Sequence, residues 1–275
     1  MTAGGVEEPL ELEWLGGAPE ARLRRRRPGI DALPWGTLDA GALGEAAVIE
    51  ARRVWTQGAF TEYASAAGFS RMTELFLACR APVDLTAAAA DCAVDELDHV
   101  ELVARLLGEL GGAAPFVADF STLAPATTPG ERPVVRAAEI ALKVSCVGEA
   151  LSVPVLASAH AAAETPLVRA VLRRLLRDEG AHARVGAWFF EWAGDRLTPG
   201  DREHLGRVAE RTIAAYAPLM GPRACSTCNL PAALGGGGGG AAAHAAVLRD
   251  AVERRVMPGL RRAGIVVPSA APDSR

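Results

Sequence analysis

Apolar residues recur along most of this chain with the 3.6-residue period of helices that bury one face. The pattern predicts four long helices, which cover residues 43–80, 84–110, 130–163 and 166–195. It predicts two further helices in the last quarter of the chain, at residues 198–219 and 241–263. Pro82 separates the first two helices, and Gly111 and Gly112 end the second. The sequence therefore predicts an all-α fold.

Three regions follow from this pattern. Residues 1–42 carry glycine, proline and charge with weak periodicity, and we predict an irregular N-terminal arm that Trp14 and Trp35 pack onto the helices. Residues 43–197 hold the four long helices, with a long proline-containing connection between the second and the third. Residues 198–275 form a helical C-terminal extension, in which the glycine run at 235–240 predicts a flexible linker.

Local signals predict where several helices begin. Thr128-Pro-Gly-Glu131 has the spacing of a capping box and predicts the start of the third long helix. Thr165-Pro166 and Thr198-Pro199 each read as an N-cap followed by proline at the first helical position. Pro154 should kink the third helix, because proline removes a backbone hydrogen bond inside a helix.

The strongest chemical signal is an Asp-Glu-x-x-His motif that occurs twice, at 95–99 and at 178–182. The chain has five histidines, and two of them stand in this same frame. Residues three apart on a helix lie on one face. Glu96 and His99 can therefore reach one metal ion, and Glu179 and His182 can reach another.

A dimetal site in the core of a helical bundle takes one more glutamate from each of two further helices. Glu62 lies 34 residues before Glu96, and Glu149 lies 30 residues before Glu179, as in a duplicated helix pair. Glu149 is the only charged residue in the segment 144–155. A lone carboxylate in an apolar helix is costly unless it is paired or bound to a metal, so its position favours a ligand.

This arrangement resembles the ferritin-like di-iron carboxylate superfamily over roughly residues 45–195. The resemblance implies a ferritin-like four-helix bundle with a long crossover between its second and third helices, followed by two additional C-terminal helices. It implies two iron ions as cofactor, with manganese as a possible replacement, because carboxylate and imidazole ligands suit both metals. Zinc could also occupy the site. The implied metal ligands are Glu62, Glu96, His99, Glu149, Glu179 and His182.

Asp95 and Asp178 directly precede the ligand glutamates, so each is rotated toward a neighbouring helix. A metal-bound histidine usually donates its second N–H to a carboxylate, which fixes its tautomer. The pseudo-symmetry of the two motifs predicts that Asp178 contacts His99 and that Asp95 contacts His182. Four arginines on the fourth helix are predicted to take its opposite, outward face: Arg169, Arg173, Arg174 and Arg177.

The resemblance favours an O2-activating oxidase or oxygenase that acts on a small organic substrate, with electrons from an external donor. A ferritin-like protein that handles iron or peroxide without an organic substrate is one alternative, and a metal-free bundle with salt-bridged Glu and His is another. Rubrerythrin-like peroxidases carry an extra glutamate where this chain has Ser152, and two Cys-x-x-Cys pairs where it has only Cys225 and Cys228. Small residues near the ligands could leave room for a substrate or allow tight helix packing; these are Gly58, Ala66, Ser145, Gly148 and Ser152.

Composition and charge restrict the partners. Half of the residues are hydrophobic, enough for a sizeable core, and the formal net charge is −4. The arginine run at 22–27 could contact nucleic acid or an acidic surface, but we interpret it as a solvated tail and do not expect it to bind nucleic acid. No N-terminal stretch has signal-peptide layout and no apolar stretch reaches transmembrane length without a charge, so we expect a cytoplasmic protein with no membrane partner. Five cysteines argue against a disulfide framework, and exposed helix faces are compatible with a homodimer.

Overall fold

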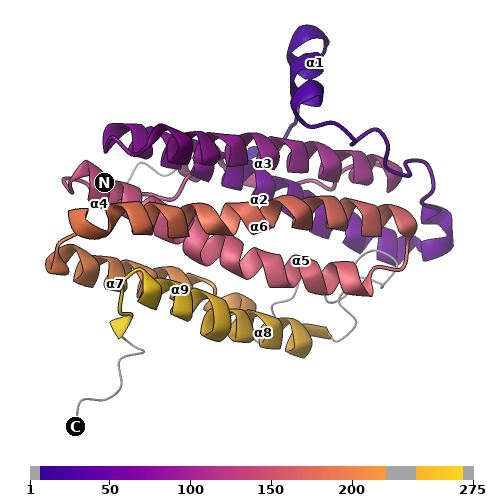
Figure 1. The fold of residues 1–275 in the computed structure, drawn as a ribbon. Helices are drawn as coiled ribbons and strands as arrows, with labels where there is room; N and C mark the ends of the chain where they lie inside the picture. The colour runs from indigo at the N-terminus through magenta and orange to yellow at the C-terminus, as the bar shows by residue number, and fades with distance from the viewer. Residues whose placement is uncertain (1–6, 221–239, 269–275) are drawn as a thin grey trace.

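The computed structural model describes residues 7–220 and 240–268, and this part of the chain is mostly helical with a single two-stranded sheet (Figure 1). The all-α prediction is confirmed at this level. The predicted long helices occur as α2 (Glu45–Ala78), α3 (Val83–Glu109), the continuous helix Pro133–Ala162 and α6 (Pro166–Ala193). Their bounds differ from the predicted ones by three residues or fewer.

The third long helix changes its winding along its length. It begins as α4 (Pro133–Ala141), continues as the π-helical segment η3 (Leu142–Glu149) and ends as α5 (Ala150–Ala162), which contains Pro154. The sequence did not predict the π-helical segment, and such segments often mark functional sites. The predicted capping box at Thr128 is wrong, because Arg132 is the N-cap and the backbone N–H of Thr128 donates to the Glu139 carboxylate at 2.7 Å.

The four long helices pack in a closed order. Helix α2 packs against α3 and α4, α3 packs against α6, and α6 packs against α5 and η3. Four residues join α2 to α3, whereas residues 110–132 form a long connection, the crossover, between α3 and α4. The crossover contains β2 (Val117–Asp119) and η2 (Phe120–Thr122). Strand β1 (Glu7–Pro9) pairs antiparallel with β2 and places Glu7 opposite Asp119.

The N-terminal arm is more regular than predicted. It contains helix α1 (Gly17–Arg26) and the short 3-10 segment η1 (Ala40–Leu43), and α1 stands out above α3 in Figure 1. Trp35 ties the arm to α3, because its ring lies 4.4 Å from the Arg105 guanidinium. Trp14 is 51% exposed, so the prediction that it packs onto the helices is wrong.

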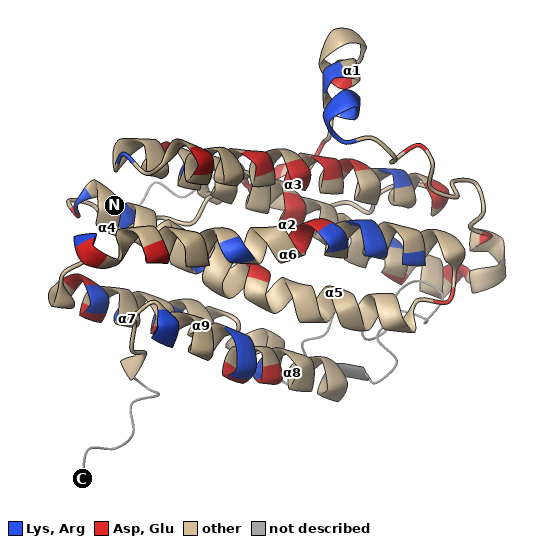
Figure 2. Ribbon diagram, in the orientation of Figure 1, with Lys and Arg blue, Asp and Glu red and all other residues tan. Residues whose placement is uncertain are grey.

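The arginine run is not a solvated tail. Arg24 lies 2.8 Å from the buried carboxylate of Glu101, and Arg27 pairs with Asp91 at 2.8 Å and also with Asp95. Figure 2 shows these opposite charges facing each other, with acidic residues spread along α3 below the arginines of α1. The run therefore neutralises the acidic face of α3.

The C-terminal extension covers the side of the molecule formed by α4, η3 and α5 (Figure 1). It consists of α7 (Pro199–Ala215), η5 (Ala217–Met220), α8 (Gly240–Ala251), η7 (Val252–Val256) and α9 (Met257–Arg262). Thr198 caps α7 through a capping box with Asp201, as the Thr-Pro signal predicts. Cys225, Cys228 and the glycine run up to residue 239 lie outside the described residues.

The apolar core forms two separate clusters. One surrounds Phe69, Phe76 and Phe189, and the other surrounds Leu106 and Val171. Along α2, α3 and α6 the two clusters are separated by a short stretch that carries Glu62, Glu96-x-x-His99 or Glu179-x-x-His182. A polar layer therefore lies in the middle of the helices, with apolar packing on both sides.

The helix Pro133–Ala162 is long and apolar enough to span a membrane by length and composition, with a mean hydropathy of 1.6 in its most apolar 18-residue window. A buried core helix has the same properties. This helix packs against α2, α6, α7 and α8, and it carries the buried carboxylates of Glu139 and Glu149. Its α4 and η3 segments are mostly buried, whereas in α5 only Leu151 is fully buried.

Candidate metal centre

The six predicted ligands converge in the polar layer. Their donor atoms form two groups of four, and within each group the atoms lie within 4.8 Å of one another. The first group is Glu62, Glu96, His99 and Glu179, and the second is Glu96, Glu149, Glu179 and His182. Either group could hold a metal ion. Glu96 and Glu179 belong to both groups, so the two positions would share these carboxylates.

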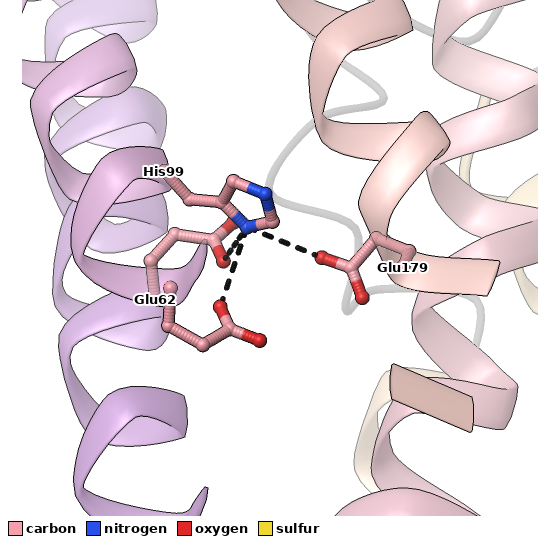
Figure 3. Close-up of side chains that lie close together, drawn as sticks. Glu62, His99 and Glu179 are labelled. Carbon is pink, nitrogen blue, oxygen red and sulfur yellow. Dashed lines mark ion pairs between the residues drawn. The ribbon is translucent and has the colours of Figure 1, made fainter. Parts of the chain in front are cut away.

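The first group is centred on His99 (Figure 3). Its Nδ1 atom lies 3.4 Å from Glu62 Oε2, 3.3 Å from Glu96 Oε2 and 3.6 Å from Glu179 Oε1. Glu62 comes from α2 and Glu179 from α6, and Figure 3 shows them approaching the same nitrogen from different sides, whereas Glu96 comes from α3, the helix of His99 itself. Such convergence on one point is what coordination of a single ion requires.

The second group mirrors the first around His182. Its Nδ1 atom lies 2.8 Å from Glu96 Oε1 and 3.5 Å from Glu179 Oε2. Each shared carboxylate thus directs one oxygen to His99 and its other oxygen to His182. Glu149 completes this group from the last residue of η3.

Burial and mutual repulsion perturb the acidity of these carboxyls. Burial raises the pKa of Glu62 to about 8, and burial together with the nearby Glu179 and Glu96 raises the pKa of Glu149 well above its usual value. Burial also opposes ionisation of Glu96, but hydrogen bonds with His182 and His99 outweigh it and lower its pKa to about 2. Without metal, the cluster therefore retains protons on some of its carboxyls.

The histidines behave as the partners of these carboxylates. Burial alone would lower the pKa of both imidazoles. Hydrogen bonds with Asp178, Glu62 and Glu96 nevertheless raise the pKa of His99, and those with Asp95 and other neighbours raise the pKa of His182. In the absence of metal, protonated imidazoles therefore offset part of the negative charge of the carboxylates.

The donor set fits a pair of divalent cations. Both carboxylate oxygens of Glu96, one of Glu179, and Nδ1 of both His99 and His182 are buried and, apart from their contacts with one another, have no hydrogen-bond partner in the described residues. Buried polar atoms are normally satisfied, so a set of them pointing at one another indicates a missing partner. Four carboxylates and two neutral imidazoles carry a formal charge of −4, which two divalent ions would offset.

The two aspartates lie behind the histidines in a crossed arrangement. Asp178 Oδ2 is 3.5 Å from His99 Nε2, and Asp95 Oδ2 is 3.4 Å from His182 Nε2. Each imidazole therefore turns Nδ1 toward the cluster and Nε2 toward an aspartate on another helix. This geometry suits neutral imidazoles protonated at Nε2, which leave the Nδ1 lone pair free for a metal.

An arginine backs each of these aspartates, and sequence reasoning missed both. Arg174 lies 2.9 Å from Asp178 and 3.5 Å from Asp98, with only 7% of its side chain exposed, so its predicted outward position is wrong. Its spacing of four from Asp178 was a usable signal. Arg27 of the N-terminal arm pairs with Asp95, and no local pattern links these two residues.

Ser145 connects η3 directly to α6 beside His182. Its hydroxyl donates to the backbone carbonyl oxygen of His182 at 2.6 Å and accepts from the backbone N–H of Gly186 at 2.8 Å. In a regular helix this N–H would bond that carbonyl directly. A Cβ on Gly186 would come 3.0 Å from the Ser145 hydroxyl, so glycine permits the close approach.

A cavity of about 470 Å³ adjoins the cluster, and Glu62, Glu149 and Glu179 form part of its wall. Among the small residues singled out in the sequence, Gly58, Gly148 and Ser152 line this cavity, whereas Ala66 and Ser145 do not. The C-terminal extension contributes four more lining residues, which the sequence did not indicate: Tyr216, Leu219, His244 and Leu248.

Comparisons with protein-family models, with curated proteins and with solved structures find no match for this chain. The interpretation of the site therefore depends on its own geometry. That geometry consists of two groups of buried donor atoms with two shared carboxylates, a crossed pair of aspartates behind the histidines, and a cavity on one side.

Proposed function

We propose that this chain is a ferritin-like di-iron carboxylate protein that activates dioxygen and oxidises a small organic substrate. The observation that carries the proposal is the sharing of Glu96 and Glu179 between two groups of four donor atoms. Two separate mononuclear sites would have no need to share ligands. Two ions held by the same pair of carboxylates would lie close enough to act on one O2 molecule.

The arrangement of the helices supports the assignment to the ferritin-like class. Four long helices pack in a closed order, and the long connection lies between the second and the third, as in bundles with a crossover. We propose residues 43–197 as the di-iron bundle, with the N-terminal arm and the C-terminal extension as additions. Oxygen and imidazole donors without thiolates favour iron, with manganese as the alternative.

Each part of the site has a defined task in this proposal. Glu62 and His99 would hold one metal, and Glu149 and His182 would hold the other. A reduced di-iron pair supplies electrons for dioxygen activation when it is bound. The crossed aspartates keep a proton on Nε2 of each histidine, and the apolar clusters on both sides limit the access of water.

The cavity supports an organic substrate over iron or peroxide handling alone. Its volume of about 470 Å³ lies within the usual range of small-molecule sites, and its wall reaches both metal positions through Glu62 and Glu149.

Among residues 7–220 and 240–268, these two groups are the only clusters of side chains suited to hold a metal. We therefore propose that electrons come from a separate donor protein.

Oxygen uptake by the iron-loaded protein tests this proposal. Anaerobic protein loaded with Fe(II) is mixed with dissolved O2 and a chemical reductant, and O2 consumption is recorded for wild type, Glu149→Ala and Glu191→Ala. Glu191 is an exposed residue of α6 and serves as the control. We expect O2 consumption in wild type and in the control, and its loss in Glu149→Ala. Two bound irons without O2 consumption would favour iron binding alone, and no bound iron would favour a metal-free bundle.

A further inference from the structure

The cavity beside the metal cluster is lined by parts of the chain that are far apart in sequence. Residues of α2, η3 and α5 line it, and the crossover contributes Leu123 and Pro125. The C-terminal extension contributes Tyr216 at the end of α7, Leu219 of η5, and His244 and Leu248 of α8. The carboxylates of Glu62, Glu149 and Glu179 lie in its wall, so a ligand in the cavity would contact the metal site directly.

Apolar side chains make up most of the remaining wall. They come from all the surrounding elements and include Val54, Leu123, Val144, Leu151, Val155 and Leu248. Five lining groups offer hydrogen bonds without a partner among the described residues: the hydroxyls of Ser65, Ser152 and Tyr216, the amide of Gln57 and the imidazole of His244. The cavity therefore suits a ligand with a mainly apolar body and few polar atoms.

Among the described residues, Lys143 is the only lysine or arginine that lines the cavity. Lys143 is the only lysine of the chain, and its Nζ donates to the carbonyl oxygen of Ala126 in the crossover at 2.5 Å. An ammonium group has three N–H donors, so two of them remain available. Lys143 lies six residues before Glu149 on the same helix, more than one helical turn away along the axis.

The acidic residues of the wall argue against a cationic ligand. Each of them, Glu62, Glu149 and Glu179, belongs to the metal cluster. A cationic ligand would thus lack a free counter-charge, whereas an anionic one would find Lys143. Tyr216 marks the metal end, because its hydroxyl lies 3.5 Å from a Cβ built on Gly148, the residue before Glu149.

We propose that this cavity binds a mainly apolar carboxylic acid, whose carboxylate pairs with Lys143 and whose hydrocarbon part extends toward Glu62 and Glu149. The inference rests on the proposed function for its claim that the ligand is the substrate. The binding claim itself depends only on the cavity and on Lys143. The charged head is thereby held away from the metals, and a carbon atom of the chain is placed beside them.

Binding of octanoate and of octan-1-ol tests the proposal, since the two probes share a hydrocarbon chain and differ in the charge of the head. Affinities are measured by isothermal titration calorimetry on protein loaded with redox-inert Zn²⁺. We expect octanoate to bind about 10- to 100-fold more tightly than octan-1-ol, the gain typical of a hydrogen bond to a charged group. Lys143→Met should abolish this preference, and Arg207→Met, which removes an exposed charge of α7, should leave it unchanged.

A second pair of variants tests whether the ligand lies in the cavity. Gly58 lines the cavity, and a Cβ built on it meets no atom within 4 Å, so Gly58→Leu would fill the space without disturbing the helix. Gly108 is an exposed glycine of α3 with equally free surroundings, and Gly108→Leu is the matched control. We expect octanoate affinity to fall at least about tenfold in Gly58→Leu and to stay unchanged in Gly108→Leu.

The outcomes separate the two proposals. Equal affinity for octanoate and octan-1-ol, or octanoate binding that persists in both Lys143→Met and Gly58→Leu, overturns the assignment of the ligand class. Zinc content is measured on the same samples. Fewer than two zinc ions per wild-type chain contradicts the proposed metal centre, whatever the result with octanoate.

Discussion

The hydroxyl of Ser145 joins the π-helical segment η3 to α6 at His182. It lies 2.6 Å from the His182 carbonyl oxygen and 2.8 Å from the amide nitrogen of Gly186. Ser145 belongs to the π-helical segment that ends at Glu149. The segment that provides Glu149 therefore also contacts the backbone of His182, another member of the second group.

Ser145→Ala should weaken the metal position of His182 selectively. Loss of the bridging hydroxyl removes the two hydrogen bonds that join η3 to α6 here, which frees the His182 backbone to move relative to Glu149. Changes to residues that orient a ligand typically reduce metal affinity about 10- to 100-fold. A competition titration with Zn²⁺ should show one weakened and one unchanged ion, and Ser152→Ala, which removes a cavity hydroxyl without a partner, should retain both affinities. Equal weakening in both variants would contradict a positioning role.

Gly186→Ala should destabilise the fold, because the new Cβ would lie 2.5 Å from Cys146 Sγ and 3.1 Å from the Ala141 carbonyl oxygen. Overpacking of this kind costs about 1–3 kcal/mol. The control is Gly108→Ala, whose Cβ meets nothing and which should stabilise the helix by up to about 1 kcal/mol. Urea unfolding of the metal-free proteins measures both. Similar stabilities for the two variants would argue against close contact between η3 and α6.

Arg27→Gln should reduce the free energy of unfolding by about 1–2 kcal/mol, because Asp95 and Asp91 lose a charged hydrogen-bond partner. Arg22→Gln removes the same charge from an exposed position of the same run and should have almost no effect. Chemical denaturation of both variants at low and moderate salt provides the comparison. An equal effect of the two substitutions on the free energy of unfolding would indicate that the arginine run is a solvated tail after all.

The contact between Glu139 and His204 predicts a pH-dependent contribution to stability. Burial disfavours the Glu139 carboxylate, but hydrogen bonds with His204 at 2.5 Å and with Thr128 outweigh it and lower its pKa below 4.5. The carboxylate of the folded protein therefore holds a proton less readily than that of the unfolded chain. Its stabilising contribution is complete above about pH 4.5 and is lost as the pH falls through the lowered pKa.

Glu139→Gln tests this contribution, because glutamine keeps the size of the side chain and cannot ionise. The difference in unfolding free energy between wild type and variant should be largest near neutral pH and should shrink below pH 4.5. Urea unfolding across the acid range measures it. A difference that does not change with pH would show that the charge of Glu139 does not contribute.

The helices and the two Glu-x-x-His pairs were open to prediction because both depend on local periodicity, whereas Glu62 and Glu149 followed from the repeat spacing of a duplicated helix pair. A spacing of three places Glu96 and His99 on one face whatever surrounds the helix. The isolated charge of Glu149 in an apolar segment also favoured a ligand on the third long helix, because a lone buried carboxylate is costly unless it is paired or bound to a metal. The helical bounds followed from proline and glycine signals, with errors at the ends, where caps compete with tertiary contacts.

The remaining features depend on packing between distant segments. Ser145 of the π-helical segment hydrogen-bonds to α6, and no residue pattern within 142–149 signals such a partner. Arg27 reaches Asp95 across 68 residues, and the arginine run alone does not indicate which acidic residues it contacts. Tyr216 and His244 line the cavity only because the extension folds back over η3 and α5, which depends on the whole arrangement of the helices.

The number of metal ions bound per chain tests the central claim most directly. Anaerobic Fe(II) loading, desalting and metal analysis are applied to wild type, Glu149→Ala, Glu96→Ala and the control Glu191→Ala. Glu149 belongs to one group of donors and Glu96 to both, so we predict about two irons in wild type and control, about one in Glu149→Ala and none in Glu96→Ala. No iron in the wild type, or the same iron content in Glu96→Ala as in the wild type, would contradict a dimetal site with shared carboxylates.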